Sequence, residues 1–274
     1  MMARLTIIRS IPRRLKRKAK TYMNPDRFTV DALVIREQQV GESDKLITLL
    51  SRNNGVIKAY ASGAKSIKSK KGAATSLLAY SSVTLTQKGD TYRVTEASPI
   101  QIFFNAGDDI EALSLAQYFC ELCIYHAPNS ENCESVLRLI LNSLHFLSNK
   151  SRDIFILKSI FEMRLMALTG YLPNLVACDG CAKYEDDIMY FDTNEGKLYC
   201  RKCHEYNSEC AVVNMTLLTA LRHIVYSDLS KLFMFSIPTD AARGLSMITE
   251  RYLLNKTEQK LKTLSFFNSL FKEF

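Results

Sequence analysis

The chain has 274 residues and a net charge of +8, and 47% of its residues are apolar and 23% charged. This length suggests about two domains of ~100–150 residues each, and the composition is that of an ordinary globular protein. The longest uncharged apolar runs, such as residues 139–147, fall far short of the ~20 residues that a membrane span needs. No signal peptide is visible either. We therefore expect a cytoplasmic protein that does not enter a membrane.

The positive charge is concentrated in the first third of the chain. Residues 1–89 carry 18 Lys and Arg against 5 Asp and Glu, whereas residues 90–274 carry 18 against 23. Such an asymmetry is typical of a module that binds a polyanion joined to a part with another role. A solvated lysine-rich surface, the alternative, usually intersperses both signs. Nucleic acid is favoured over a membrane surface, because no amphipathic basic helix accompanies the charge.

Residues 1–27 form a basic extension with nine Lys and Arg and one Asp. Its apolar surface is too small to offset the entropy lost on ordering, so we expect it to be disordered by itself. Two interpretations stay open. The extension is a DNA-binding arm, or it is an upstream addition with Met23 as the natural start.

Residues 28–103 have the two-residue alternation of β-strands. Two clusters, residues 53–55 and 88–90, have the chemistry of hairpin turns, since each supplies Gly or Asn where a positive φ is needed. Five short strands predict a small closed barrel, which leaves no exposed sheet edge. Residues 63–72 are too polar for a strand and predict a basic loop. The expected strands cover residues 30–35, 46–50, 56–61, 83–85 and 91–95.

After residue 105 the apolar period changes to 3.6, which predicts a helical domain. Asp108 or Asp109 is a plausible N-cap of the first helix, and Gly170 ends the third before Pro173. The expected helices cover residues 110–124, 136–147, 154–168, 216–226, 239–255 and 258–271.

Two Cys-x2-Cys pairs, separated by eighteen residues, follow the third helix. This spacing is that of a structural zinc site with four thiolate ligands. A pair of disulfides is the alternative, and a cytosolic context disfavours it. His204 could replace Cys203 as a ligand, but a second Cys-x2-Cys pair has the better geometry. The predicted ligands of one structural Zn²⁺ are Cys178, Cys181, Cys200 and Cys203.

Other motifs are absent or have plainer explanations. Cys120 and Cys123 are also separated by two residues, but they lie within a helical apolar stripe and are expected to be buried as small hydrophobic residues. No phosphate-binding Gly-rich loop, nucleophile elbow or zinc-protease helix occurs. We therefore expect no enzymatic activity.

The order and spacing of several short motifs resemble the RecO family of bacterial DNA repair and recombination mediators. The motifs are Ala32-Leu33-Val34-Ile35-Arg36, Gly41-Glu42-Ser43-Asp44-Lys45, the loop 63–72, Gly170-Tyr171-Leu172-Pro173 and Gly196-Lys197-Leu198-Tyr199-Cys200. The chain has Glu195-Gly196 where the family commonly has Gly-Gly, and residues 77–80 are less aromatic than usual. The extension has no counterpart in the family.

This resemblance implies an α+β, multidomain fold. An N-terminal OB-fold barrel, residues 28–103, is followed by a helical domain, residues 104–274, which contains a hairpin with the four-cysteine zinc knuckles at 175–206. It also implies that the protein binds single- and double-stranded DNA, anneals complementary strands without ATP, and works with RecR. Together they help RecA to load on DNA coated by single-strand-binding protein, whose C-terminal tail is a further expected partner. The expected location is the bacterial nucleoid.

An OB fold pairs a positive groove with stacking surfaces, which suits DNA binding. Tyr60, Tyr80 and Tyr92 are possible stacking platforms, although strand tyrosines often belong to the core. The expected phosphate contacts are Lys45, Arg52, Lys58, Lys65, Lys68, Lys70 and Lys71. Two other functions compete: an RNA-binding OB-fold protein of transcription or translation, and a thiol-dependent redox enzyme.

Overall fold

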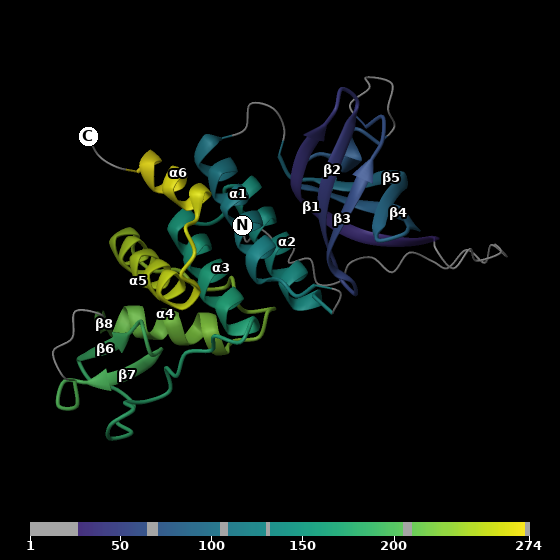
Figure 1. Ribbon diagram of the computed structural model, residues 1–274. Helices are drawn as coiled ribbons and strands as arrows, with labels where there is room; N and C mark the ends of the chain where they lie inside the picture. Colours follow the sequence, from purple (N-terminus) through teal and green to yellow (C-terminus); the bar gives the residue numbers. More distant parts are fainter. Residues whose placement is uncertain (1–26, 65–70, 105–108, 130–131, 205–209, 272–274) are drawn as a thin grey trace. The chain divides into compact units, whose positions relative to one another are not determined.

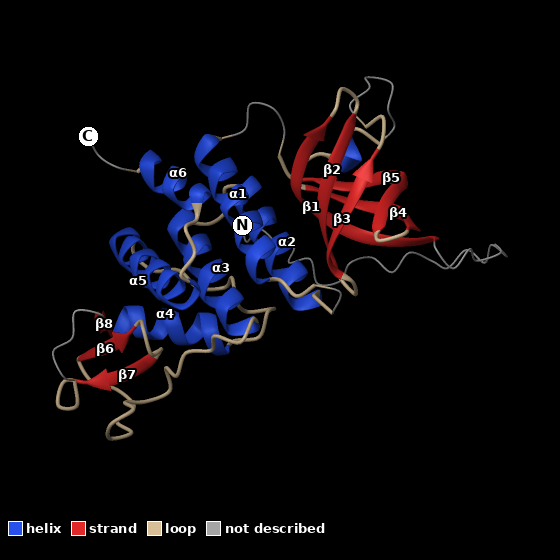
Figure 2. Ribbon diagram, viewed as in Figure 1, coloured by secondary structure: helices blue, strands red, loops and turns tan. Residues whose placement is uncertain are grey.

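The computed structural model describes residues 27–64, 71–104, 109–129, 132–204 and 210–271. The described residues fall in two compact units, one made by residues up to 148 together with residues from 263 onward, and the other by residues 149–262. The first unit contains a barrel and three helices, and the second contains three helices and a small sheet (Figures 1 and 2).

The barrel consists of five strands in the order β1-β2-β3-β5-β4, closed by the pairing of β4 with β1. Neighbouring strands are antiparallel except β3 and β5, which are parallel and pair Tyr60 with Arg93. Gly55 and Gly89, both at φ +59°, make the hairpin turns that the sequence predicts. The strands are β1 (Arg27–Val40), β2 (Asp44–Ser51), β3 (Gly55–Ala61), β4 (Ala79–Lys88) and β5 (Thr91–Ile102).

Alternating side chains fill the barrel with a compact apolar core. The fully or nearly fully buried members come from all five strands: Ala32, Val34, Ile47, Leu49, Ile57, Ala59, Ala79, Val83, Leu85 and Val94. Leu33 and Ile35 of β1 are buried as well, although they do not belong to this core cluster. The pairing of β1 with β2 has an irregularity between Val34 and Arg36. The predicted β-barrel of the OB type is confirmed.

Three helices complete the first unit: α1 (Ile110–His126), α2 (Glu134–Ser148) and α6 (Lys262–Leu270). Asp109 caps α1 by accepting a hydrogen bond from the Glu111 N–H. The segment between α1 and α2 is bonded to the barrel, since the Cys133 N–H donates to the Arg52 carbonyl over 2.7 Å.

In the second unit, α3 (Ile154–Leu168) packs against α5 (Thr239–Thr257) and α4 (Met215–Tyr226). A buried ion network joins α3 to α5, in which Lys158 Nζ lies 2.8 Å from carboxylate oxygens of both Glu162 and Glu250. A sheet of three antiparallel strands, in the order β7-β6-β8, precedes α4. These strands are β6 (Ile188–Asp192), β7 (Lys197–Cys200) and β8 (Cys210–Asn214).

The sequence predicts this α+β architecture, but several details differ. The zinc-knuckle hairpin has a third strand, β8. The last helix begins at Lys262 rather than at residue 258, because Glu258 adopts a left-handed conformation (φ +51°) that ends α5. A short 3-10 helix, Ala73–Thr75, follows the predicted basic loop. The predicted domain bounds stay a prediction: they separate barrel from helices, whereas the compact units group α1 and α2 with the barrel.

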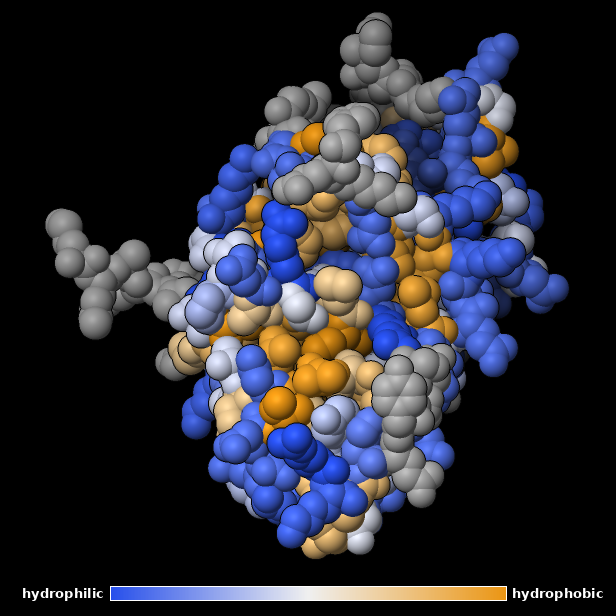
Figure 3. Space-filling view, turned by 90° about the vertical axis from the view of Figure 1, so that its left-hand side faces the viewer, coloured by the Kyte–Doolittle hydropathy of each residue, from blue (hydrophilic) through white to orange (hydrophobic). Residues whose placement is uncertain are grey.

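Among the helices in the described ranges, none is long and apolar enough to cross a membrane. On the face drawn in Figure 3, hydrophilic residues surround hydrophobic ones.

Candidate metal centre and nucleic-acid interface

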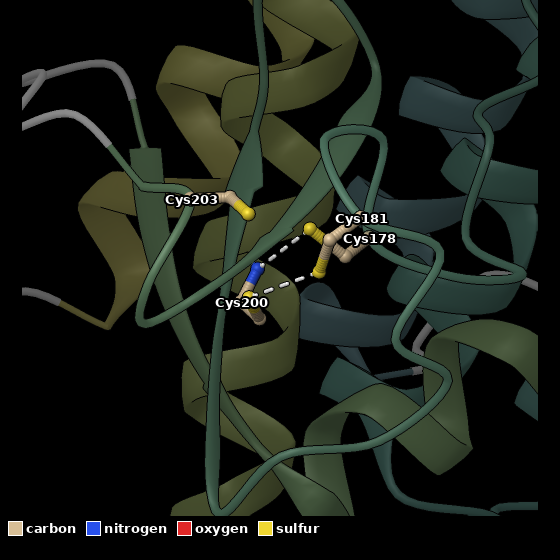
Figure 4. Close-up of side chains that lie close together, drawn as sticks. All are labelled: Cys178, Cys181, Cys200 and Cys203. Carbon is tan, nitrogen blue, oxygen red and sulfur yellow. Dashed lines mark hydrogen bonds between the residues drawn. The ribbon is translucent and has the colours of Figure 1, made fainter.

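The four cysteines of the two Cys-x2-Cys pairs converge in the second unit. Their Sγ atoms all lie within 4.8 Å of one another, and the two pairs face each other (Figure 4). The Sγ atoms of Cys181 and Cys200 are 3.6 Å apart. The sulfurs of a regular tetrahedron with Zn–S bonds of ~2.3 Å are separated by ~3.8 Å. The four residues that the sequence predicts as ligands are thus brought together at a spacing that suits zinc.

Local backbone structure holds each pair in place. In the first pair the Ala182 N–H donates to the Cys178 carbonyl over 2.8 Å, and in the second the Cys203 N–H donates to the Cys200 carbonyl over 3.0 Å. A Cβ atom on Gly180 would lie 3.0 Å from the Cβ of Cys203 and 3.1 Å from its Sγ. The two pairs can approach this closely because position 180 has no side chain.

The thiols have unequal proton affinities. Desolvation opposes ionisation of Cys178, but hydrogen bonds from the backbone N–H groups of Cys200, Cys181 and Gly180 lower its pKa to about 6. Hydrogen bonds with the side chains of Cys181 and then Cys200 raise the pKa of Cys203 to about 12. A metal ion that binds here must displace the remaining thiol protons. Four soft sulfur donors in this arrangement fit Zn²⁺, and they leave no coordination position open for catalysis.

The remaining cysteines and His204 are not part of this cluster. The ring of His204 is stacked on Tyr190, with ring centroids 3.8 Å apart and planes at 4°. Cys203, and not His204, belongs to the group of potential ligands. Cys120 and Cys123 are buried in α1, as predicted, and desolvation raises the pKa of both thiols. None of the eight cysteines, all of which lie within the described residues, forms a disulfide.

Helix α5 supports the hairpin that leads to the second pair. The Tyr252 hydroxyl donates to the Tyr171 carbonyl over 2.9 Å, and its ring lies 3.2 Å from the Cβ position of Gly196. The side chain of Asn255 donates to the hydroxyl of Thr193 over 2.9 Å. The hairpin therefore sits on a well-packed helix face.

On the barrel, the predicted phosphate contacts have different environments. Lys45 is buried, and its Nζ lies 2.8 Å from a carboxylate oxygen of Glu37. Arg52 is 3.9 Å from the Glu134 carboxylate, and Lys71 Nζ donates to the Val94 carbonyl over 3.3 Å. Lys58 on β3 is exposed. The other three residues, Lys65, Lys68 and Lys70, lie outside the described residues.

Strand pairing adds two arginines that the sequence analysis missed. The register places Arg36 of β1 opposite Thr48 of β2, and Thr48 opposite Lys58. Tyr60, two residues after Lys58 and thus on the same side of β3, pairs with Arg93 of β5. Four of these side chains are exposed, and we call them the basic face: Arg36, Lys58, Tyr60 and Arg93.

The three tyrosines proposed as stacking platforms differ in exposure. Tyr60 is 38% exposed, whereas Tyr80 is only 5% exposed. Tyr92 is partly buried against the core and meets Phe28 edge to face, with ring centroids 5.7 Å apart. Tyr80 and Tyr92 are core residues, so Tyr60 is the candidate platform among the three.

Comparison with known proteins finds a match for both parts of the chain. Residues 23–103 match the family model for the N-terminal part of recombination protein O, and residues 107–265 match the model for its C-terminal part. The chain is similar to the DNA repair protein RecO of Acetivibrio thermocellus, with 32% identity over 87% of this chain and 95% of that protein. It is similar to the DNA repair proteins RecO of Dehalococcoides mccartyi (28% identity, 90% and 97% covered) and Symbiobacterium thermophilum (26%, 89% and 97%). The chain therefore belongs to the RecO family.

Proposed function

We propose that this protein is a DNA repair and recombination mediator that binds single- and double-stranded DNA through its barrel and anneals complementary strands without ATP. The observation that carries the proposal is the basic face, where exposed cationic side chains of β1, β3 and β5 share one side of the barrel with the exposed Tyr60. Cationic side chains neutralise phosphates, and an aromatic ring offers a stacking surface that tolerates any base. Family membership supports DNA as the polyanion.

Annealing requires no bond to be made or broken within the protein. Two polyanions must be neutralised and brought together, after which base pairing supplies the free energy. The proposed mediator is accordingly not an enzyme, and it acts in the cytoplasm at the nucleoid. We propose Lys65, Lys68, Lys70 and Lys71 as further phosphate contacts.

The four cysteines are proposed to hold one structural Zn²⁺. When bound, the ion supplies folding free energy, because a preformed site rarely exists in an unfolded chain. The residues around the ion hold the four sulfur atoms at distances that suit one ion. They also bond the segments that carry the cysteines to α4 and α5. This role leaves DNA binding to the barrel.

The proposed partners follow from family membership. The protein is proposed to act with RecR, to contact the C-terminal tail of single-strand-binding protein, and so to help RecA load on coated DNA.

The test is an annealing assay with complementary oligonucleotides in nucleotide-free buffer, with and without RecR. We expect the protein to accelerate duplex formation without ATP. A requirement for ATP hydrolysis by this chain alone contradicts the proposal. A second arm uses RNA strands of the same sequence; if only RNA is annealed, the protein is an RNA-binding OB-fold protein instead, since recognition of the 2′-hydroxyl distinguishes the two.

A further inference from the structure

Arg222 of α4 lies beyond the last of the four cysteines in the sequence, yet its side chain is bonded to the segment that carries the first pair. Its Nε donates to the Leu175 carbonyl over 2.8 Å. One of its terminal nitrogens, Nη2, donates to the carbonyls of Val176, over 2.9 Å, and Tyr184, over 2.6 Å. Only 12% of the side chain is exposed.

In the sequence, these carbonyls belong to residues on both sides of the first cysteine pair. Leu175 and Val176 precede Cys178, and Tyr184 follows Cys181. One planar guanidinium group therefore closes the segment 175–184 into a loop, with both thiols inside the closure. Arginine is suited to this task because its donors form a rigid planar fork, whereas the lysine ammonium is a compact point charge.

Further contacts hold the guanidinium group itself. It lies over the ring of Tyr184, with the guanidinium carbon 4.1 Å from the ring centroid. Its other terminal nitrogen is 3.5 Å from the Glu185 carboxylate. One helical turn later, the Tyr226 hydroxyl donates to the Pro173 carbonyl over 3.2 Å and accepts from the Leu175 N–H over 2.9 Å.

We propose that Arg222 is a positioning residue of the metal centre: it fixes the loop that carries Cys178 and Cys181 against α4 and so sets the affinity of the site for zinc. The inference rests on the proposed structural zinc. Groups that orient metal ligands typically change metal affinity by about 10–100-fold when they are removed. A bonded loop also loses less conformational freedom when the ion binds.

The experiment compares R222Q, R222K and the control R243Q in the full-length protein. Arg243 is an arginine of the same compact unit whose guanidinium packs over the Phe155 ring at 4.9 Å. Zinc affinity is measured by competition with a chromophoric chelator, and the ligand field is followed by the absorption of bound Co²⁺. These two readouts report the metal site directly, whereas a purely structural role of the arginine would change only thermal stability.

For R222Q we expect zinc affinity to fall by about 10–100-fold with altered Co²⁺ absorption. R222K should fall nearly as far, because an ammonium group cannot reach three carbonyls, and R243Q should match the wild type. Wild-type affinity in R222Q overturns the inference, as does an equal loss in R243Q. If R222Q does not fold, Y226F removes the α4 hydroxyl that bonds to Pro173 and Leu175 at the start of the same loop, and zinc affinity should fall several-fold. Unchanged affinity in Y226F overturns the inference too. A wild-type chain that binds neither ion contradicts the metal centre itself, and the inference with it.

Discussion

The barrel and the four-cysteine sheet are both small β-structures, but they are held together by different means. In the barrel, all five strands have two neighbours, and their inward side chains form a continuous apolar core. The small sheet has three strands of four or five residues, and within the described residues β7 and β8 each have a single neighbour. Its side chains Met189, Phe191 and Leu198 are buried.

We expect the two structures to differ in their need for a metal. Closure removes the unpaired edges of the barrel and gives it enough buried apolar surface to fold without a ligand. Three short strands bury too little surface for independent stability, so small domains of this kind commonly depend on a metal or on a neighbouring helix. The first unit should therefore withstand loss of the metal, and the second should not.

The largest effect is expected when the first cysteine pair is replaced. In C178S/C181S we expect the proposed zinc to be lost, and with it a stabilising contribution that is on the order of 10 kcal/mol in small metal domains. We expect the variant to be poorly soluble or to unfold at a much lower temperature, while DNA affinity of the soluble fraction falls far less. The measurement is zinc per chain together with thermal unfolding. The control C120A/C123A removes two buried thiols of α1 and should keep its zinc. Wild-type stability in C178S/C181S contradicts a structural metal.

A smaller but still large effect is expected inside the second unit, away from the cysteines. Desolvation raises the pKa of Glu162, although the charge of Lys158 acts in the opposite direction. The variant K158M leaves this buried carboxyl group without its lysine, which should lower the free energy of unfolding by about 3–5 kcal/mol. Urea denaturation measures the change.

The control for this variant is R27M, which breaks the exposed ion pair of Arg27 with Glu96 on the barrel (2.7 Å) and should change stability little, because water screens exposed charges. Equal losses of unfolding free energy in the two variants would show that the buried α3–α5 network stabilises the protein no more than an exposed ion pair does.

A third variant tests the exposed ring of the basic face. Y60A should weaken binding of single-stranded DNA by about 1–3 kcal/mol, the usual contribution of one base stacked on an aromatic side chain. Fluorescence anisotropy with a labelled oligonucleotide measures the change. Double-stranded DNA should be less affected, because its bases are already stacked on one another. Unaltered affinity for single strands would remove Tyr60 from the interface.

The smallest effect is expected at Tyr80. Its buried hydroxyl has no hydrogen-bond partner among the described residues, and desolvation raises its pKa to about 12. Y80F therefore loses no hydrogen bond, and stability should stay the same or rise by up to ~1 kcal/mol. DNA affinity should not change. A marked loss of affinity would return Tyr80 to the list of stacking residues.

Much of the architecture could be predicted because it depends on local patterns. Alternating residues and turn glycines such as Gly55 and Gly89 predict the barrel strands. The spacing of the two Cys-x2-Cys pairs predicts that the four cysteines lie together, as the structure shows. Asp109 was one of two expected caps. These signals lie within a few residues of the elements they specify.

The missed features depend on contacts between distant segments. Arg93 joins the basic face because β3 and β5 are parallel, a pairing that no alternation reveals. The burial of Lys45 and its ion pair with Glu37 across β1 and β2 could not be read from the sequence either, and its role as a phosphate contact stays a prediction. Similarly, nothing in the sequence near Arg222 indicates that it bonds to a loop almost fifty residues earlier.

The claim that DNA lies on the basic face is tested most directly by the salt dependence of affinity for single-stranded DNA. Each phosphate contact contributes about −0.7 to the log–log slope on single strands. The variant R36A/K58A/R93A should therefore bind more weakly at low salt and have a slope flatter by up to about 2 units. The control K231A/R243A/K260A removes the same charge from exposed positions of the second unit and should keep the wild-type slope. A wild-type slope in the barrel variant, or an equal loss in the control, would contradict this placement of the DNA.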